Sequence, residues 1–226
     1  MDYTITIQNN TGDANQAFRY IAFGFPHGTH ATQGGVGLPV VFYQSRLLND
    51  GEPVTFNISS TVFGFLGNAS QINTDLTAGA NISLTKALPV NLGGRAGDGT
   101  ELEAKPRTGG GVDFKTADSR LSPPGTFSII ASSALKHKNQ YAVGLARKID
   151  GNYVPVTVFG LHPGQTFDIT PIESIYIARH STTATNTVVN ADSYSLKQEV
   201  NLQPDQPKIT VTDDGAPTSF KVRYNY

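Results

Sequence analysis

Cysteine and tryptophan are both missing from this chain of 226 residues, and charged residues are scarce. Without cysteine there is no disulfide scaffold, no zinc–thiolate site and no cysteine nucleophile. Lysine, arginine, aspartate and glutamate make up 15% of the residues, against roughly 25% in an average soluble protein. Carbohydrate sites often stack sugars on tryptophan, and without it the nine tyrosines could serve instead.

The chain also lacks clustered charge and long apolar runs. Its net charge is −1 and it has no basic run, which excludes nonspecific binding to nucleic acid and a polybasic membrane anchor. No apolar run approaches the roughly 18 residues of a transmembrane helix. Residues 1–5 read as a strand, without the regions of a signal peptide. We therefore expect a cytoplasmic protein, or one exported without a classical signal peptide, and we expect no cofactor.

Hydrophobic and polar residues alternate along many short segments, which predicts an all-β protein. Apolar side chains occupy every second position in residues 3–7, 54–58, 209–211 and 220–224, and we also predict strands at 17–23 and 173–179. Asp150 and Gly151 separate two further candidate strands, 141–149 and 153–159, and this dipeptide predicts a tight hairpin.

Seven short matches recur in the same order in the two halves of the chain. The longest joins residues 55–59, Thr-Phe-Asn-Ile-Ser, to residues 166–170, Thr-Phe-Asp-Ile-Thr. The others pair 15–16 with 139–140, 39–40 with 155–156, 51–52 with 164–165, 83–84 with 195–196, 90–92 with 200–202 and 114–115 with 220–221. Chance matches in a polar background are the alternative, but the conserved order favours an internal duplication.

The repeat predicts two tandem β-sandwich modules with Greek-key, immunoglobulin-like connections. Module one covers residues 1–118, a linker containing Ser-Pro-Pro-Gly covers 119–125, and module two covers 126–226. Phe56 and Phe167 would then occupy equivalent core positions, as would Phe114 and Phe220. The alternative is one large sandwich with internal pseudo-symmetry.

Two segments resemble a loose group of uncharacterised microbial, largely fungal, all-β proteins. Residues 4–12, Thr-Ile-Thr-Ile-Gln-Asn-Asn-Thr-Gly, look like the first strand of that group, and residues within 155–171 are similar to a later strand pair. The resemblance implies an all-β fold, and it implies no activity.

A glycine-rich stretch, residues 24–38, is the best candidate for a binding loop. Module one has about 13 more residues than module two between equivalent positions, most of them in this stretch. Long loops on a rigid scaffold often carry binding sites, and glycine lets the backbone approach a ligand closely. We predict that ligand contacts come from His27, Thr29, His30, Thr32 and Gln33.

Motifs for catalysis are absent. The chain has no Gly-x-Ser-x-Gly element and no phosphate-binding glycine loop in a strand–helix context. Glu101 and Glu103 have the spacing of a carboxylate pair on one strand face, but their polar, glycine-rich surroundings predict a solvated face. His27 and His30 would need a third ligand to hold a metal, so no metal site is predicted.

The sequence therefore favours a non-enzymatic, lectin-like recognition or adhesion protein that binds a glycan or another surface. Paired modules and a polar surface suit shallow recognition strengthened by avidity. One alternative is a structural protein whose edge strands self-assemble into homo-oligomers. The other is a hydrolase or metal-dependent enzyme that uses His27 and His30.

Overall fold

The computed structural model contains β-strands and short turns, as the alternation predicts. It describes residues 2–24, 30–31, 35–71, 75–117, 122–135, 141–180, 182–215 and 220–225. The only helical element among them is a single 3-10 turn, η1 (Ala191–Ser193). In this part of the chain no helix is long and apolar enough to span a membrane.

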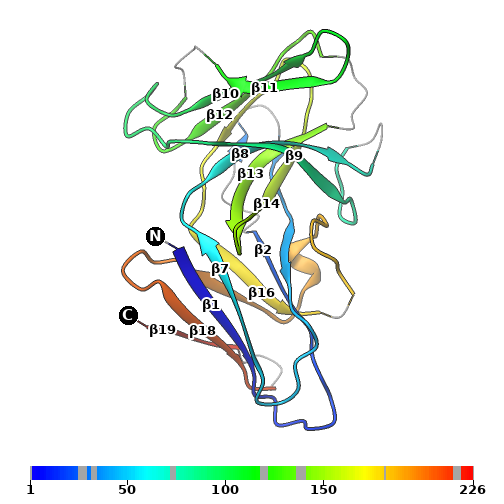
Figure 1. Ribbon diagram of the computed structural model, residues 1–226, viewed down its shortest axis with the longest axis vertical. Coiled ribbons are helices and arrows are strands. Elements are labelled where there is room, and N and C mark those ends of the chain that lie inside the picture. Colours follow the sequence, from blue (N-terminus) through cyan, green and yellow to red (C-terminus); the bar gives the residue numbers. More distant parts are fainter. Residues whose placement is uncertain are drawn as a thin grey trace.

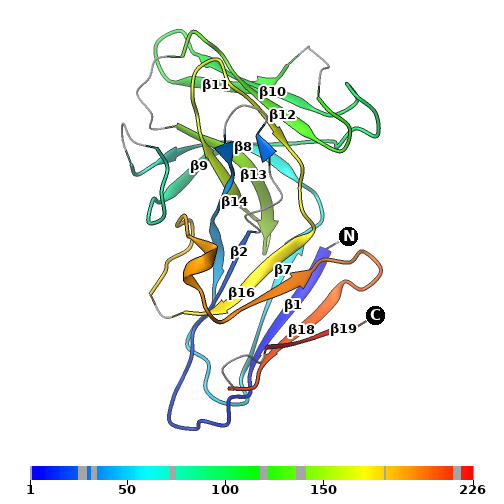
Figure 2. The same cartoon turned by 180° about the vertical axis from the view of Figure 1, so that it is seen from behind.

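Eight strands form the part that lies at the bottom of Figure 1, which we call the lower lobe. One of its strand layers has the order β19-β18-β1-β7, built from β1 (Asp2–Asn9), β7 (Pro53–Ser59), β18 (Lys208–Asp213) and β19 (Phe220–Asn225). The other has the order β17-β16-β2-β6, built from β2 (Tyr20–Gly24), β6 (Val41–Gln44), β16 (Ser174–Arg179) and β17 (Lys197–Asn201). Figure 2 shows β2 and β16 in front of β1 and β18, so the two layers lie one behind the other.

Eight more strands form the upper lobe. One layer has the order β11-β10-β12-β15, built from β10 (Glu101–Pro106), β11 (Val112–Thr116), β12 (Phe127–Ala131) and β15 (Thr166–Ile169). The other places β8 (Phe63–Ala69) between β9 (Ile82–Pro89) and β13 (Tyr141–Ile149), with β14 (Asn152–Gly160) on the far side of β13. The inward side chains of both lobes belong to one continuous hydrophobic core.

The two lobes share one sheet. Ile149 at the end of β13 pairs with Ile58 of β7, and this single pair joins a layer of each lobe into a curled nine-stranded sheet. β5 (Leu38–Pro39) extends this sheet beyond β14. β3 (His30–Ala31) pairs with β4 (Gly35–Val36) in a separate two-stranded sheet.

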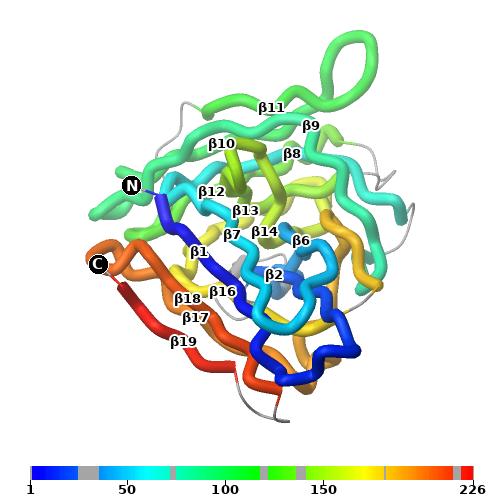
Figure 3. The backbone as a smooth tube through the Cα atoms, turned by 60° about the horizontal axis from the view of Figure 1, so that its bottom comes forward, coloured from blue at the N-terminus to red at the C-terminus, as the bar shows by residue number. Residues whose placement is uncertain are grey.

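Each lobe takes four strands from each half of the chain. β1 pairs in parallel with β18, and β2 pairs with β16, so the first strands of the chain share layers with the last ones. Figure 3 shows β1 running beside β18 and β19. Residues 1–118 and 126–226 therefore interleave in space, and the predicted linker at 119–125 connects β11 to β12 within one layer of the upper lobe.

Burial explains why some strands alternate and others do not. In β1, every second side chain from Tyr3 to Asn9 is buried, as the sequence predicts for a strand with one face in the core. All five residues of β2 are buried, and so are seven of the nine in β13, including the unbroken run 142–147. The outer faces of these strands are covered by two smaller apolar clusters that include Val188 and Val189, so both faces avoid water.

The hairpin predicted between 141–149 and 153–159 is confirmed. β13 and β14 pair antiparallel, and the connecting residues Asp150 and Gly151 both have positive φ, 47° and 83°. Two positive φ values define the type I′ turn, whose twist matches that of the flanking strands.

Phe56 and Phe167 are both fully buried, as predicted, and pair with Ile5 and Ile129 respectively. We expect Phe56→Ala and Phe167→Ala each to lower the unfolding free energy by about 3–5 kcal/mol, because each truncation leaves a cavity. Urea unfolding monitored by circular dichroism measures the loss. Tyr153→Ala is the control, since Tyr153 is 44% exposed; a smaller loss for either phenylalanine than for Tyr153 would contradict the assigned core.

Candidate functional site

Of the five residues predicted to bind a ligand, only one lies in a described strand. His30 begins β3, and its backbone pairs with Val36. His27, Thr29, Thr32 and Gln33 lie outside the described residues. The site is therefore built here from the described end of this loop, residues 35–39.

A cavity of ≈ 390 Å³ opens beside that end of the loop. Three segments line it, residues 36–39, 76–78 and 189–192. Most of its wall is apolar, and Val36 stands at its edge with 62% of its surface exposed. The volume falls within the range of small-ligand pockets, roughly 300–1,000 Å³.

Backbone pairing between two long connections holds the cavity in place. Residues 70–81 connect β8 to β9 in the upper lobe, and residues 180–196 connect β16 to β17 in the lower lobe. Val188 pairs with Val40, and its N–H donates to the carbonyl of Ala80 at 2.8 Å. Val189 donates to the carbonyl of Pro39 at 2.9 Å. The cavity thus lies where the two lobes and the loop end meet.

Polar groups occupy the rim of the cavity beside η1. The Asn190 side-chain oxygen accepts a hydrogen bond from the Asp192 backbone N–H at 3.0 Å, and this bond caps the turn without using the Asn190 amide N–H groups. The Asp192 carboxylate is 84% exposed, and Lys197 Nζ lies 3.4 Å from it. Thr77 completes the polar side. The cavity combines an apolar wall with donors and acceptors on one rim.

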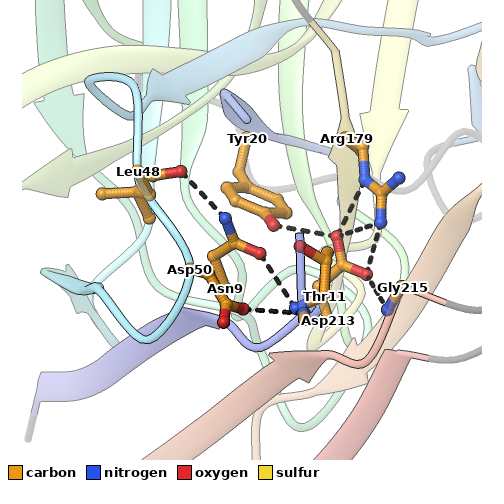
Figure 4. Close-up of polar contacts among 9 residues, drawn as sticks. Asn9, Thr11, Tyr20, Leu48, Asp50, Arg179, Asp213 and Gly215 are labelled. Atoms are coloured by element: carbon orange, nitrogen blue, oxygen red, sulfur yellow. Dashed lines mark hydrogen bonds and ion pairs between the residues drawn. The ribbon is translucent and has the colours of Figure 1, made fainter. Parts of the chain in front are cut away.

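A buried polar network connects the two layers of the lower lobe (Figure 4). Asp213 in β18 accepts hydrogen bonds from Arg179 Nε and Nη2 in β16 at 2.6–2.8 Å. The Tyr20 hydroxyl in β2 donates to the same carboxylate at 2.8 Å, and the Gly215 backbone N–H donates at 3.0 Å. Asp213 is 2% exposed, so its charge is balanced by Arg179 instead of by water.

Tyr20 is held in its protonated form by this network. Burial, followed by the hydrogen bond to Asp213, raises the pKa of Tyr20 well above that of an ordinary tyrosine. The folded protein therefore binds the phenol proton more tightly than the unfolded chain does. The stability that this contributes is present below the ordinary tyrosine pKa and is lost as the pH rises above it.

A second, polar concavity of ≈ 560 Å³ lies on the outer face of β1, β18 and β19. Gln8, Thr210, Thr212 and Arg223 line it, together with Lys221, whose Nζ lies 2.5 Å from Asp214. Threonine, glutamine and basic side chains make this face suited to hydrogen bonding and poorly suited to holding an apolar ligand.

The carboxylate pair considered from the sequence is not a solvated face. Glu101 is 3% exposed in β10, and Glu103 lies 3.3 Å from Lys105. The expectation was wrong for Glu101 because β10 is an inner strand of its layer, between β11 and β12. Among the described residues, no three His, Cys, Asp or Glu side chains are grouped closely enough to hold a metal ion.

Comparison with known proteins finds no relative. No family model, no curated protein and no solved structure matches the chain.

The sequence reading missed the Arg179–Asp213–Tyr20 network and the cavity beside η1. Tyr20 and Asp213 are separated by 193 positions, and no local pattern marks either as a partner of the other. The residues around Asp213 and Gly215 indicate no more than a turn before the last strand. The one available signal was Arg179, a cation at the end of a largely apolar strand.

We expect Asp213→Asn to lower the unfolding free energy by about 3 kcal/mol, because it leaves Arg179 without its counter-charge in a partly buried site. Asp214→Asn is the matched control. Its partner Lys221 has a side chain that is 76% exposed, so its loss should be below about 1 kcal/mol. Urea unfolding at neutral pH measures both, and equal losses would show that the buried network does not clamp the two layers.

Proposed function

We propose that this protein is a non-enzymatic recognition protein that binds a glycan in the cavity formed by residues 36–39, 76–78 and 189–192. The observation that carries the proposal is the composition of this cavity, with an apolar wall opposite a rim of amide, hydroxyl and carboxylate groups. A sugar ring has the complementary surface, with C–H groups on its faces and hydroxyls around its edge. Asn190 and Asp192 can donate to and accept from those hydroxyls.

The position of the cavity supports the same proposal. Ligand sites occur preferentially between structural units, and this one lies where both lobes meet the end of the 24–38 loop. The predicted contact residues His27, Thr29, His30, Thr32 and Gln33 precede the exposed Val36 in the chain. These five residues are therefore only a few positions in the sequence from a residue that lines the cavity. We keep them in the proposal as candidate ligand contacts.

Self-assembly through strand edges is the weaker candidate. The edge strands β11, β17 and β19 each carry charged side chains, among them Lys115, Lys197 and Lys221. Natural β-proteins place charges, and lysine especially, on edges to prevent edge-to-edge pairing. This arrangement favours a ligand-binding role over a self-assembling one.

We also propose that the two halves of the chain are copies of one eight-stranded unit that have exchanged their last four strands. The pairings support this one by one. β1 pairs antiparallel with β7 and parallel with β18, as β12 pairs antiparallel with β15 and parallel with β10. β2 lies between β6 and β16, as β13 lies between β14 and β8.

Details of register agree with this correspondence. The β2–β6 ladder skips Phe42 between Ala22 and Phe23, and the β13–β14 ladder skips Val156 between Leu145 and Ala146. Phe56 and Phe167 face corresponding residues, Ile5 and Ile129. The register does not support the predicted pairing of Phe114 with Phe220. Under the proposed correspondence Val222 matches Phe114, because Val222 faces Val211 and Phe114 faces Ala104.

The proposed exchange predicts that the lower lobe can fold alone when its two stretches of chain are joined directly. The Arg147 guanidinium contacts both the Ser59 carbonyl and the Glu173 carboxylate, at 3.1 and 2.7 Å, so the ends of β7 and the start of β16 lie close together. We expect a chain that joins residues 2–60 directly to 172–225 to fold as a monomeric β-protein with a cooperative thermal transition. The control joins 2–60 to 126–171. This second segment contains neither β18, the parallel partner of β1, nor β16, the neighbour of β2, so we expect the control not to fold. Cooperative folding of the control alone would contradict the exchange.

The binding site is tested with two variants on a glycan array. We expect Val36→Glu and Asp192→Asn each to weaken glycan binding by about tenfold or more, since the first charges the apolar wall and the second removes an acceptor. Leu92→Glu is the control, because Leu92 is 39% exposed and lies outside the cavity. Binding that survives both cavity changes and is lost in the control would place the site elsewhere.

A further inference from the structure

The polar concavity of ≈ 560 Å³ on the outer face of β1, β18 and β19 shares no lining residue with the cavity beside η1. Residues that lie opposite each other on neighbouring strands point to the same side of a sheet. Arg223 of β19 lies opposite Thr210 of β18. Lys221 lies opposite Thr212, which in turn lies opposite Gln8 of β1. The register therefore places all five side chains on one side of the sheet.

The other side of these strands belongs to the core. Ile209 and Val211 of β18 are buried there, and Val222 and Tyr224 of β19 pack against them. Among the described residues that line the concavity, Val222 alone is apolar and none is aromatic. This wall therefore offers hydrogen bonds and charge, with no ring on which a base stacks and no surface for a lipid chain.

Positive charge dominates the concavity. Lys221 and Arg223 line it, and the described lining residues include no acidic side chain. Asp214 forms an ion pair with Lys221, whose side chain is 76% exposed. Arg223 is also exposed and forms no ion pair within the described part of the chain. Asp2 and Asp150 contact β7, on the side of the sheet away from β19.

The edge pair β10–β11 of the upper lobe shows a different arrangement of charge. Lys115 lies opposite Glu103, and Asp113 lies opposite Lys105. The Glu103 carboxylate also lies 3.3 Å from Lys105 Nζ. Each cation of that pair of strands therefore has an acid opposite it, whereas β18 places only threonines opposite the cations of β19. A hydroxyl group does not neutralise a cation, which leaves the cations of β19 accessible to an anion from outside the chain.

We propose that this concavity binds an anionic polysaccharide. Lys221 and Arg223 hold its carboxylate or sulfate groups by charge-assisted hydrogen bonds. The hydroxyls of Thr210 and Thr212 and the amide of Gln8 bind its hydroxyl groups, since each can donate and accept. The two cations are two residues apart on one strand, roughly 7 Å between Cα atoms, so one ligand chain contacts both. This site does not depend on glycan binding in the cavity beside η1.

The proposal is tested with the full chain and fluorescein-labelled ligands, followed by fluorescence anisotropy at one fixed ionic strength. Heparin oligosaccharides supply sulfate groups, and oligogalacturonate supplies carboxylates alone. Dextran is the neutral control, an oligothymidylate carries phosphate without sugar hydroxyls on a pyranose ring, and phosphatidylserine vesicles present an anionic membrane. We expect saturable binding of at least one anionic polysaccharide, at least about tenfold tighter than binding of the other three probes.

The double variant Lys221→Gln/Arg223→Gln is expected to weaken that binding by about tenfold or more. The matched control is Arg95→Gln/Arg107→Gln, the same charge change at two exposed positions of the upper lobe, and it should leave binding unchanged. If the first double variant does not fold, Arg223→Gln alone replaces it.

Thr210→Val tests the hydroxyl contacts separately, because it keeps every charge and the shape of the side chain. We expect it to weaken binding several-fold. The proposal is overturned if neither polysaccharide binds, if the oligothymidylate or the vesicles bind as tightly as the better polysaccharide, or if the variant at positions 221 and 223 binds as tightly as the control at positions 95 and 107.

Discussion

The guanidinium of Arg147 lies where the chain crosses from one lobe to the other. It is 2% exposed, and it contacts the carbonyl at the end of β7 and the carboxylate just before β16. After β7 the chain leaves for the upper lobe, and after β15 it enters the lower one. A buried cation is tolerated only where it is paired and hydrogen-bonded, so these contacts tie the two crossings together. Every layer of both lobes depends on the crossings, because none is completed by one half of the chain alone.

Under the proposed exchange, the two halves of the chain differ at this point. The position in β2 that corresponds to Arg147 is Gly24, and a Cβ atom there would lie 2.3 Å from the Val156 carbonyl oxygen. A side chain at position 24 would therefore collide with the β14 backbone. Arg147 alone contacts the chain at both crossings. The same comparison places Leu66 and Val143 of the upper lobe where the lower lobe has Arg179 and Tyr20. The upper lobe thus closes with apolar packing where the lower lobe uses its polar network.

This difference concerns how the two layers of each lobe are held together. A buried ion pair is seldom the most stabilising way to fill a core. The free energy needed to remove two charges from water often exceeds their mutual attraction, and apolar side chains avoid this penalty. The lower lobe keeps the pair, and the pair joins β16 of one layer to β18 of the other. The upper lobe has only apolar residues at those places and presents no cation there. The two lobes therefore have matching strand pairings and differ in the side chains that join their layers.

The sequence by itself determined the local structure of this protein. Alternation in residues 3–7 and 209–211, the Asp150–Gly151 turn and the buried Phe56 and Phe167 follow from interactions between near neighbours, which a single strand or hairpin reveals. The short matching segments were also visible in the sequence, in the same order in both halves. Only the tertiary structure decided which strand pairs with which. The preference of a strand for a buried, pleated surface does not depend on whether its partner comes from its own half of the chain or from the other. The cavity beside η1 and the Arg179–Asp213 pair result from that choice of partner, because each is assembled from segments far apart in the chain.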